Sequence, residues 1–234
     1  MEPIKALFFD AVGTLFKVRG TVGGIYAEVA GRYGVHASAP ELDEGFKRGF
    51  KKIDRLVYEN FPREQWDQAE REWWFHLVHE VFSGLNRIPE PYETYFEDVY
   101  RTFQDPRSWE IYPDVLEHLT ILKKRGYIIG IISNFDRRIF PICNGLGLTE
   151  CVDSIHLPRD VGAAKPDPRI FQAALTQHQL LPHQAVHIGD HPVEDVDGAK
   201  LAGLIPVLIE RNGSQNGSEV VRSLRDLVLW IERM

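Results

Sequence analysis

Hydrophobic and polar positions follow two different patterns along this chain. Short, unbroken apolar runs that are bounded by glycine, proline or polar residues are typical of buried strands. Predominantly apolar runs of this kind occupy residues 6–9, 127–132, 185–188 and 205–209, and a further short strand is expected near residues 154–157. Between residues 20 and 109, apolar residues instead recur three or four positions apart, which is the spacing of amphipathic helices. The first pattern predicts a sheet, and the second predicts an all-helical insert.

The later strands alternate with helical segments. These segments lie at residues 114–125, 138–145, 170–178, 193–202 and 224–232. Strand and helix in alternation predict an α/β fold with a doubly wound parallel sheet of Rossmann-like organisation. We therefore expect a core domain built from residues 1–16 and 110–234, and an inserted domain of four or five helices at residues 17–109. A polar loop rich in glycine and serine is expected at residues 212–218.

The expected insert is rich in aromatic residues. Its tryptophans, which could line a substrate site, are Trp66, Trp73, Trp74 and Trp109. Aromatic residues at helical spacing more often fill a core, so we favour a packing role for them.

Composition narrows the class of protein. The 234 residues are 44% hydrophobic, enough for a substantial core, and the net charge of -7 without a basic cluster argues against a nucleic-acid partner. No apolar run is long enough to span a membrane, and strand-type sequence from Ile4 onward leaves no room for a signal peptide. The two cysteines, Cys143 and Cys151, could pair, but a reducing cytosol is the simpler setting. We expect a soluble cytoplasmic protein with no nucleic-acid or membrane partner, and the sequence leaves its oligomeric state open.

Four polar clusters follow the apolar runs. They are Asp10 with Thr14, Ser133 with Asn134, Lys165, and Asp190 with Asp195. In an open parallel sheet, ligands bind beyond the carboxyl ends of the strands, so the topology predicts that these clusters meet at one edge. Each has a plainer interpretation by itself, since Asp190 could cap a helix and Asp195 could lie in a solvated first turn. All four in this order favour a site.

The same segments carry a family resemblance. They are Asp10-Ala-Val-Gly-Thr-Leu15, Ser133-Asn134, Lys165-Pro-Asp-Pro-Arg-Ile-Phe171, and Gly189-Asp190 with Asp195 and Gly198-Ala199. Over nearly its whole length the chain resembles the haloacid dehalogenase (HAD)-like hydrolase superfamily, with a helical cap inserted after the first motif. The sequence around Lys165 and Ser133-Asn-Phe-Asp-Arg-Arg138 is similar to the rhythmically expressed gene 2-like branch, close to the HAD-like hydrolase domain-containing 3 proteins. The resemblance implies that residues 17–109 form a cap and that Asp10, Asp190 and the carbonyl of Val12 bind Mg²⁺. It also implies that Asp195 holds the metal-bound waters or Lys165.

The chemistry that these residues support is phosphoryl transfer. It needs an in-line nucleophile and cations that offset charge on the phosphoryl oxygens. Asp10 can supply the nucleophile and form an aspartyl-phosphate that water then hydrolyses. Ser133 or Thr14 would donate hydrogen bonds to the transferring group, and Lys165 would pair with Asp10 and the phosphoryl oxygens. Carboxylates suit Mg²⁺, and without a metal their mutual repulsion should make one of the three aspartates titrate high.

One position departs from the family pattern. HAD phosphatases usually carry a second aspartate two positions after the nucleophile, as general acid and base, and this chain has Val12 there. Such help is worth about 10²–10⁴-fold in rate. The leaving group could depart unaided, as from an acyl or aryl phosphate. Alternatively, another residue such as His191, Asp136 or Glu28 could substitute, or the protein could be a weak catalyst that acts mainly as a binder.

Two related activities also lack the second aspartate. Haloacid dehalogenases carry Asp-Ala-Tyr-Gly-Thr-Leu and need no metal, whereas this chain keeps Asp190 and Asp195, and a buried acidic cluster is costly without a cation. Phosphonoacetaldehyde hydrolases use a cap lysine, but Lys47, Lys51 and Lys52 are typical of a solvated helix face. We therefore predict a Mg²⁺-dependent phosphatase that acts on a small phosphorylated metabolite. The alternatives are a 2-haloacid dehalogenase-like hydrolase and a weakly catalytic binding protein.

Overall fold

A computed structural model of the chain describes residues 3–54, 56–85, 87–211, 213, 217 and 219–233. The chain forms two compact units, one from Met1–Lys17 with Glu110–Met234 and the other from Val18–Trp109. We call the first the sheet unit and the second the helical unit. Strand β2 (Phe16–Val18) leads out of the sheet unit, β3 (Trp109–Ile111) leads back into it, and the two form a two-stranded sheet.

The sheet unit is built on six parallel strands in the order β5-β4-β1-β6-β7-β8. Their bounds are β1 Ala6–Phe9, β4 Ile128–Ile132, β5 Ser154–His156, β6 Ala185–Gly189, β7 Ile205–Ile209 and β8 Val220–Val221. Central β1 pairs with β4 on one side and β6 on the other, so Phe9 lies level with Ile131 and Ile188. Unbroken apolar sequence is what a strand covered on both faces requires. This confirms the predicted doubly wound α/β fold.

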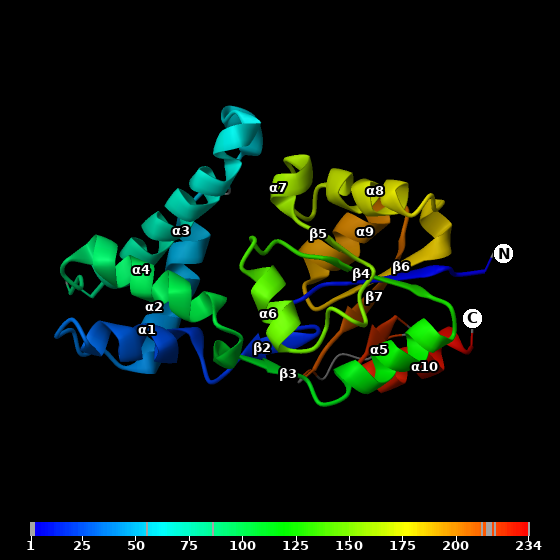
Figure 1. The fold of residues 1–234 in the computed structure, drawn as a ribbon, viewed down its shortest axis with the longest axis horizontal. Helices are drawn as coiled ribbons and strands as arrows, with labels where there is room; N and C mark the ends of the chain where they lie inside the picture. The colour runs from blue at the N-terminus through cyan, green and yellow to red at the C-terminus, as the bar shows by residue number, and fades with distance from the viewer. Residues whose placement is uncertain are drawn as a thin grey trace. The chain divides into compact units, whose positions relative to one another are not determined.

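Helices cover both faces of this sheet. They are α5 Val115–Lys124, α6 Ile139–Gly145, α7 Pro158–Val161, α8 Pro168–Gln177, α9 Gly198–Leu201 and α10 Leu224–Ile231. In Figure 1, α5 and α10 lie side by side on one face, and α8 and α9 lie on the other. Phe8 from β1 and Ile170 and Phe171 from α8 are fully buried in the core between α8, α9 and the sheet. Each such side chain contributes about 1.5–3 kcal/mol on burial, so this packing fixes where the strand ends lie.

The structure contains several short elements that the sequence pattern did not predict. Strands β2, β3 and β8 and helix α7 are each two to four residues long, too short to show a period. The helix expected at residues 193–202 begins instead as a π-helix, Pro192–Asp197, before α9. The carbonyl of His191 accepts the N–H of Val196, five residues on, and this wider turn is frequent at functional sites. The polar loop expected at residues 212–218 lies outside the described residues, apart from Gly213 and Gly217.

The helical unit contains α1 Val22–Gly31, α2 Ala39–Lys52, α3 Trp66–Ser83 and α4 Tyr92–Gln104, with single 3-10 turns at Tyr58–Asn60, Arg63–Gln65 and Pro106–Ser108. Among the described residues these are four α-helices, within the predicted four or five. Ser38 and Glu41 form a capping box that starts α2, which supports the helix by satisfying backbone donors. A Cβ at Gly23 would lie 2.1 Å from the carbonyl oxygen of Ala39, so glycine permits α1 and α2 to pack closely.

Aromatic side chains fill the interior of the helical unit. Tyr26 packs against Phe82 and Phe103, with ring centroids 6.4 and 5.6 Å apart. The indole N–H groups of Trp66 and Trp109 donate to main-chain carbonyls of the same unit. Trp109 is buried, which confirms its packing role, whereas Trp66, Trp73 and Trp74 are half-buried.

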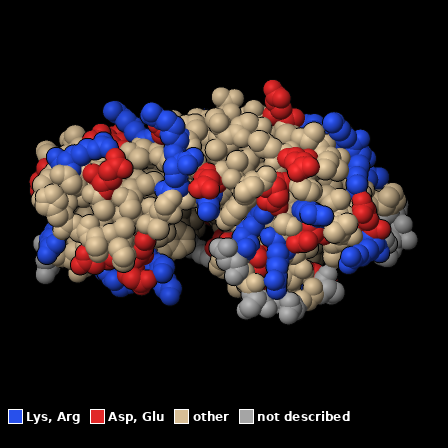
Figure 2. Space-filling view, turned by 90° about the horizontal axis from the view of Figure 1, so that it is seen from below, with Lys and Arg blue, Asp and Glu red and all other residues tan. Residues whose placement is uncertain are grey.

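The structure can be compared with the predictions about membrane segments, surface charge and cysteines. Among the described helices, none combines the length and apolarity that a membrane crossing would need. On the face shown in Figure 2, basic and acidic side chains are interspersed. Cys143 and Cys151 are free thiols, and burial raises the pKa of Cys143 to about 12, which makes it a poor nucleophile.

Candidate active site

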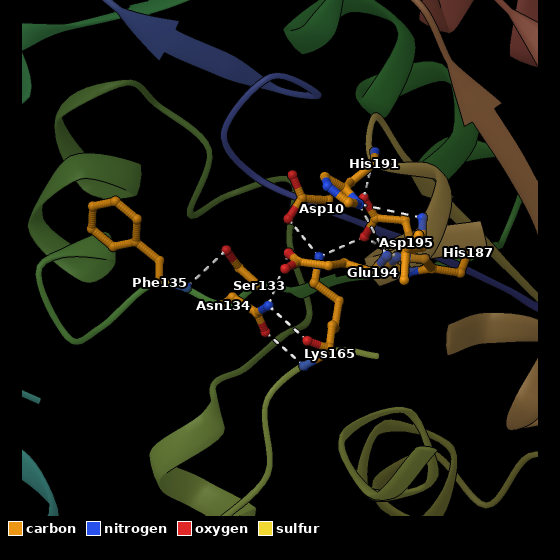
Figure 3. A network of polar contacts seen from close by, with 10 residues as sticks. Asp10, Ser133, Asn134, Phe135, Lys165, His187, His191, Glu194 and Asp195 are labelled. Carbon is orange, nitrogen blue, oxygen red and sulfur yellow. Dashed lines mark hydrogen bonds and ion pairs between the residues drawn. The ribbon is translucent and has the colours of Figure 1, made fainter. Parts of the chain in front are cut away.

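Asp10 and Lys165 form the centre of a buried polar network at the carboxyl end of the sheet (Figure 3). Asp10 is the first residue after β1, and its N–H donates to the carbonyl of Ile188 on β6 at 2.8 Å. The Nζ atom of Lys165 lies 2.6 Å from Oδ1 of Asp10 and 2.6 Å from Oδ1 of Asp195. All three side chains are buried. One ammonium group therefore joins two carboxylates that come from different strand ends.

Asp190 completes a group of three carboxylates. Asp10, Asp190 and Asp195 each offer an oxygen, and these oxygens all lie within 4.8 Å of one another. Gly13 makes room for Asp190, because a Cβ at Gly13 would lie 2.3 Å from its Oδ2 atom and the φ angle of +92° suits glycine. An all-oxygen donor set of this kind fits a hard divalent cation such as Mg²⁺. The three residues could therefore hold a metal.

The ionisation of these groups reflects their confinement. Burial raises the pKa of Asp10 to about 7, with Lys165 opposing the rise and the other two carboxylates adding to it. Partial desolvation of its carboxyl group and the charge of Asp195 raise the pKa of Asp190 to about 6, although this residue is the exposed member of the three. Repulsion predicted one aspartate with a raised pKa, whereas two have one, and burial contributes more to both rises than repulsion does. Burial by itself lowers the pKa of Lys165, but the two carboxylates outweigh it and hold that pKa above its usual value, so the amine stays charged.

Asp195 is held by more partners than the sequence suggested. Besides Lys165, its carboxylate accepts the N–H of His191 at 2.9 Å and lies 2.9 Å from Nε2 of His187. Burial lowers the pKa of His187, so the ring is neutral and donates from Nε2, and its buried Nδ1 has no hydrogen-bond partner in the part of the chain that the structure describes. A Cβ at Gly189 would lie 2.1 Å from Cγ of Asp195. Sequence reasoning missed His187, although a histidine inside the apolar run of β6 was a visible signal.

Ser133 and Asn134 follow β4, and their side chains make different hydrogen bonds. Ser133 is buried, and its Oγ accepts the N–H of Phe135 at 3.3 Å. The Oδ1 atom of Asn134 accepts the N–H of Lys165 at 2.7 Å, and its Nδ2 donates to the carbonyl of Lys165 and to Oε2 of Glu194, both at 3.0 Å. Both amide hydrogens are engaged within the protein. Asn134 therefore fastens the backbone at Lys165, and Glu194, which the sequence did not indicate, anchors Asn134.

The loop after Asp10 contains Val12 and Thr14. Backbone hydrogen bonds close it, from Gly13 to the carbonyl of Phe16 at 2.8 Å and from Leu15 to that of Ala11 at 2.8 Å. Thr14 is fully buried, and its Oγ1 has no hydrogen-bond partner among the described residues. An unsatisfied buried hydroxyl costs about 1–3 kcal/mol, so a bound oxyanion would find a donor in place. Val12 is half-buried in this loop, and its side chain has no proton to give.

The three residues named as substitutes for the missing acid have other partners. His191 starts the π-helix, because its Nδ1 accepts the N–H of Val193 at 3.3 Å and of Glu194 at 3.1 Å. Asp136 forms a buried ion pair with Arg138, with Oδ2 2.6 Å from Nη2. Glu28 pairs with Arg32 on the exposed side of α1. Phosphonoacetaldehyde hydrolases use a cap lysine to form a Schiff base. The lysines considered for that role are exposed on α2, as the solvated-face interpretation predicts; they are Lys47, Lys51 and Lys52.

The fold and this cluster define a class of hydrolase, and comparison with known proteins agrees. A family model described as haloacid dehalogenase-like hydrolase matches residues 4–203. The chain therefore belongs to the HAD-like hydrolase family.

Relatives within the family can be named. The chain is 32% identical over 209 residues to haloacid dehalogenase-like hydrolase domain-containing protein 3 of Bos taurus, covering 88% of this chain and 82% of the relative. It is 30% identical over 219 residues to the rhythmically expressed gene 2 protein of Drosophila melanogaster, covering 89% and 84%. The predicted resemblance to this branch is confirmed.

Solved structures show the same fold. A HAD phosphatase from Thermococcus onnurineus is 25% identical with a TM-score of 0.66, and covers 96% of each chain. A dehalogenase is 23% identical with a TM-score of 0.70, covering 97% of this chain and 96% of its own. The HAD hydrolase YfnB of Bacillus subtilis, in a magnesium-bound structure, is 15% identical with a TM-score of 0.77, covering 99% and 100%. Both a phosphatase and a dehalogenase thus share the fold, which leaves the reaction to the site.

Proposed function

We propose that this protein is a Mg²⁺-dependent phosphatase that hydrolyses a small phosphorylated metabolite through an aspartyl-phosphate on Asp10. The observation that carries the proposal is the buried contact of Lys165 with Asp10 and Asp195 beside a third carboxylate, Asp190. Dehalogenation needs no such acidic cluster. Three carboxylates with one ammonium group leave an excess of negative charge, which a divalent cation would balance.

Each residue has a distinct part in the proposed reaction. A carboxylate oxygen of Asp10 attacks phosphorus, the bond from phosphorus to the leaving oxygen breaks, and water then hydrolyses the aspartyl-phosphate to release phosphate. Lys165 orients Asp10 and offsets phosphoryl charge, and Thr14 or Ser133 would donate hydrogen bonds to the transferring phosphoryl group. Asp10, Asp190 and the Val12 carbonyl would hold Mg²⁺, with Asp195 beside them. When bound, the metal supplies charge stabilisation for the phosphoryl oxygens.

Val12 narrows the class of substrate. With no carboxylic acid at this position, an alkoxide leaving group would depart without a proton, which is slow. Acyl and aryl phosphates release stable anions that need no proton. We therefore propose that the natural substrate carries a good leaving group of this type.

The proposal also covers the role of the helical unit and the cellular location of the protein. We propose that the helical unit acts as a cap that selects the substrate, and that the protein works in the cytoplasm on a small molecule. Neither a nucleic-acid nor a membrane partner is expected, given the net charge of -7.

The central test is phosphate release from p-nitrophenyl phosphate. The wild type should release phosphate with Mg²⁺ present, and EDTA or Asp10→Asn should abolish the release. A second candidate, a dehalogenase, is favoured by the sequence Asp10-Ala-Val-Gly-Thr-Leu15. Metal-independent halide release from 2-chloropropionate would replace the phosphatase with that candidate. Mg²⁺ binding without turnover on a broad panel of phosphate esters would instead indicate a binding protein.

A further inference from the structure

Arg211 lies outside every motif that defines the family, two residues after β7, and yet it reaches the loop that follows Asp10. Its guanidinium donates to the carbonyl oxygen of Thr14 from Nη2 at 2.7 Å and from Nε at 3.2 Å. The two residues are 197 positions apart in the chain. The side chain of Arg211 is only 8% exposed. This contact is therefore a built part of the site's surroundings and not a surface pair.

Three further contacts hold the guanidinium in place. Its Nη1 lies 2.7 and 2.9 Å from the two carboxylate oxygens of Asp114, and its Cζ lies 4.2 Å from the ring centroid of Tyr112. Oδ2 of Asp114 also accepts the N–H of Leu224, the first residue of α10, at 2.6 Å. Arg211 is thus anchored on one side to the starts of α5 and α10, and on the other to the loop of Asp10. A planar fork with fixed donors can hold both sides at once.

The positive charge of Arg211 is neutralised by the adjacent carboxylate of Asp114. Its long-range field at Asp10 is therefore weak, and what reaches the site is the hydrogen bonding to the Thr14 carbonyl. Bonds from a charged donor are about twice as strong as neutral ones. They restrain the peptide that follows Thr14, a residue whose own buried hydroxyl has no hydrogen-bond partner among the described residues. Arg211 therefore affects the site by fixing the position of the loop backbone and not by its charge.

We propose that Arg211 is a positioning residue, which holds the Asp10 loop in the shape that presents Thr14 and the loop N–H groups to the phosphoryl group. This inference rests on the proposed phosphatase function for its kinetic consequence. It predicts that loss of the guanidinium loosens the loop at residues 11–16, while every contact of the Asp10 side chain is kept. Small misplacements of reacting groups cost up to about 10²-fold in rate.

The kinetic test compares three variants on p-nitrophenyl phosphate with Mg²⁺. Arg211→Met should lower kcat by about 10–10²-fold with KM changed much less. Arg211→Lys keeps the charge and the pairing with Asp114, but a single ammonium cannot reproduce the fork, so it should recover thermal stability more than kcat. Ser223→Ala is the matched control, because it removes the N-cap of α10 next to Leu224 and makes no bond to Thr14. It should lower Tm and leave kcat within about twofold.

Two results would overturn the inference. One is a kcat for Arg211→Met within twofold of the wild type, and the other is an equal loss of kcat in Ser223→Ala, which would reduce Arg211 to a structural residue. A readout without turnover separates this from failure of the phosphatase proposal. Hydrogen exchange at the amides of Gly13 and Leu15 should speed up in Arg211→Met and not in Ser223→Ala. If the wild type hydrolyses no phosphate ester, unchanged exchange in Arg211→Met still refutes the positioning role.

Discussion

The two units place ion pairs of the same length in opposite surroundings. In the sheet unit, Lys165 lies 2.6 Å from Asp10 and from Asp195, and all three side chains are buried. In the helical unit, Lys52 lies 2.6 Å from Glu80, yet the lysine side chain is 69% exposed. Exposed pairs are worth about 0–1 kcal/mol, whereas breaking a buried pair costs about 3–5 kcal/mol. Burial, not distance, thus distinguishes charges placed for chemistry from charges that serve solubility.

The helical unit also shows what a buried polar contact without a site looks like. The hydroxyl of Tyr58 donates to Oε1 of Glu70 at 2.5 Å, and both residues are buried. Around them the packing is aromatic, as between Tyr58 and Trp66, whose ring centroids are 5.3 Å apart. Among the described residues, Glu70 belongs to no group of three potential metal ligands. The sheet unit differs because several buried charges converge at its strand ends.

The largest expected difference between the two units is that between the variants Lys165→Met and Lys52→Met. The first removes the only ammonium group in contact with Asp10 and Asp195 among the described residues, and should cost about 3–5 kcal/mol of unfolding free energy and about 10²–10³-fold in phosphatase rate. The second should cost less than about 1 kcal/mol and leave the rate unchanged. Urea unfolding and turnover of p-nitrophenyl phosphate measure both. Equal stability losses in the two variants would contradict the burial argument.

Acid sensitivity should originate in part from His156 in the sheet unit. Its Nε2 lies 3.1 Å from Oγ of Ser154, which also contacts Nε2 of His178 at 2.8 Å, and Phe8 packs edge-on at 6.3 Å. Burial, with the charge of His178, lowers the pKa of His156 from 6.5 to about 4. The unfolded chain therefore binds the proton more readily between these values. Stability from His156 is fully present above about pH 6.5 and lost as the pH falls to about 4, by about 3 kcal/mol.

The contribution of His156 is isolated by comparison with His156→Gln. Asp10 and Asp190, whose pKa values are raised, change stability in the opposite direction as the pH falls, so the wild-type curve alone is insufficient. The difference in unfolding free energy between wild type and variant should shrink from pH 7 to pH 4. A difference that stays constant over this range would show that His156 is not the acid-sensitive group.

Val12→Asp tests whether the site lacks only a proton donor. If it does, the rate on an alkyl phosphate should rise by up to about 10²-fold, and the rate on an aryl phosphate should hardly change, because its leaving group needs no proton. Steady-state kinetics with β-glycerophosphate and p-nitrophenyl phosphate measure the two rates. Val12→Asn, of similar size but without an acid, is the control. An unchanged rate on both substrates would indicate that another residue already supplies the proton.

The smallest expected changes in stability are those of alanine substitutions at two glycines, one in each unit. Gly189→Ala forces a Cβ to within 2.1 Å of Cγ of Asp195, and should cost about 1–3 kcal/mol together with activity. Gly31→Ala on α1 meets nothing within 4 Å and should stabilise by about 0.5 kcal/mol. Thermal unfolding of both variants checks the signs. A stabilised Gly189→Ala would mean that Asp195 can move without cost.

The sequence by itself determined the fold class and the positions of the main site residues. Short apolar runs that alternate with helical segments indicate strands covered on both faces, and in a parallel sheet the residues after such strands meet at one edge. Asp10, Lys165, Asp190 and Asp195 follow this rule, although Asp10 and Lys165 are 155 positions apart. That Gly13 and Gly189 leave the space that Asp190 and Asp195 fill is seen only in the structure.

Only the tertiary structure decided which partners complete the site. Asn134 belongs to a predicted catalytic cluster with Ser133, yet its amide is engaged by Lys165 and Glu194. His187 and Arg211 carry no motif, because a side chain's partners depend on elements that pack from elsewhere in the chain. The π-helical turn that carries Asp195 depends on hydrogen bonds and not on a residue period. Local pattern specifies the strands and their ends, but the pairing of side chains across long loops depends on packing, which no local pattern records.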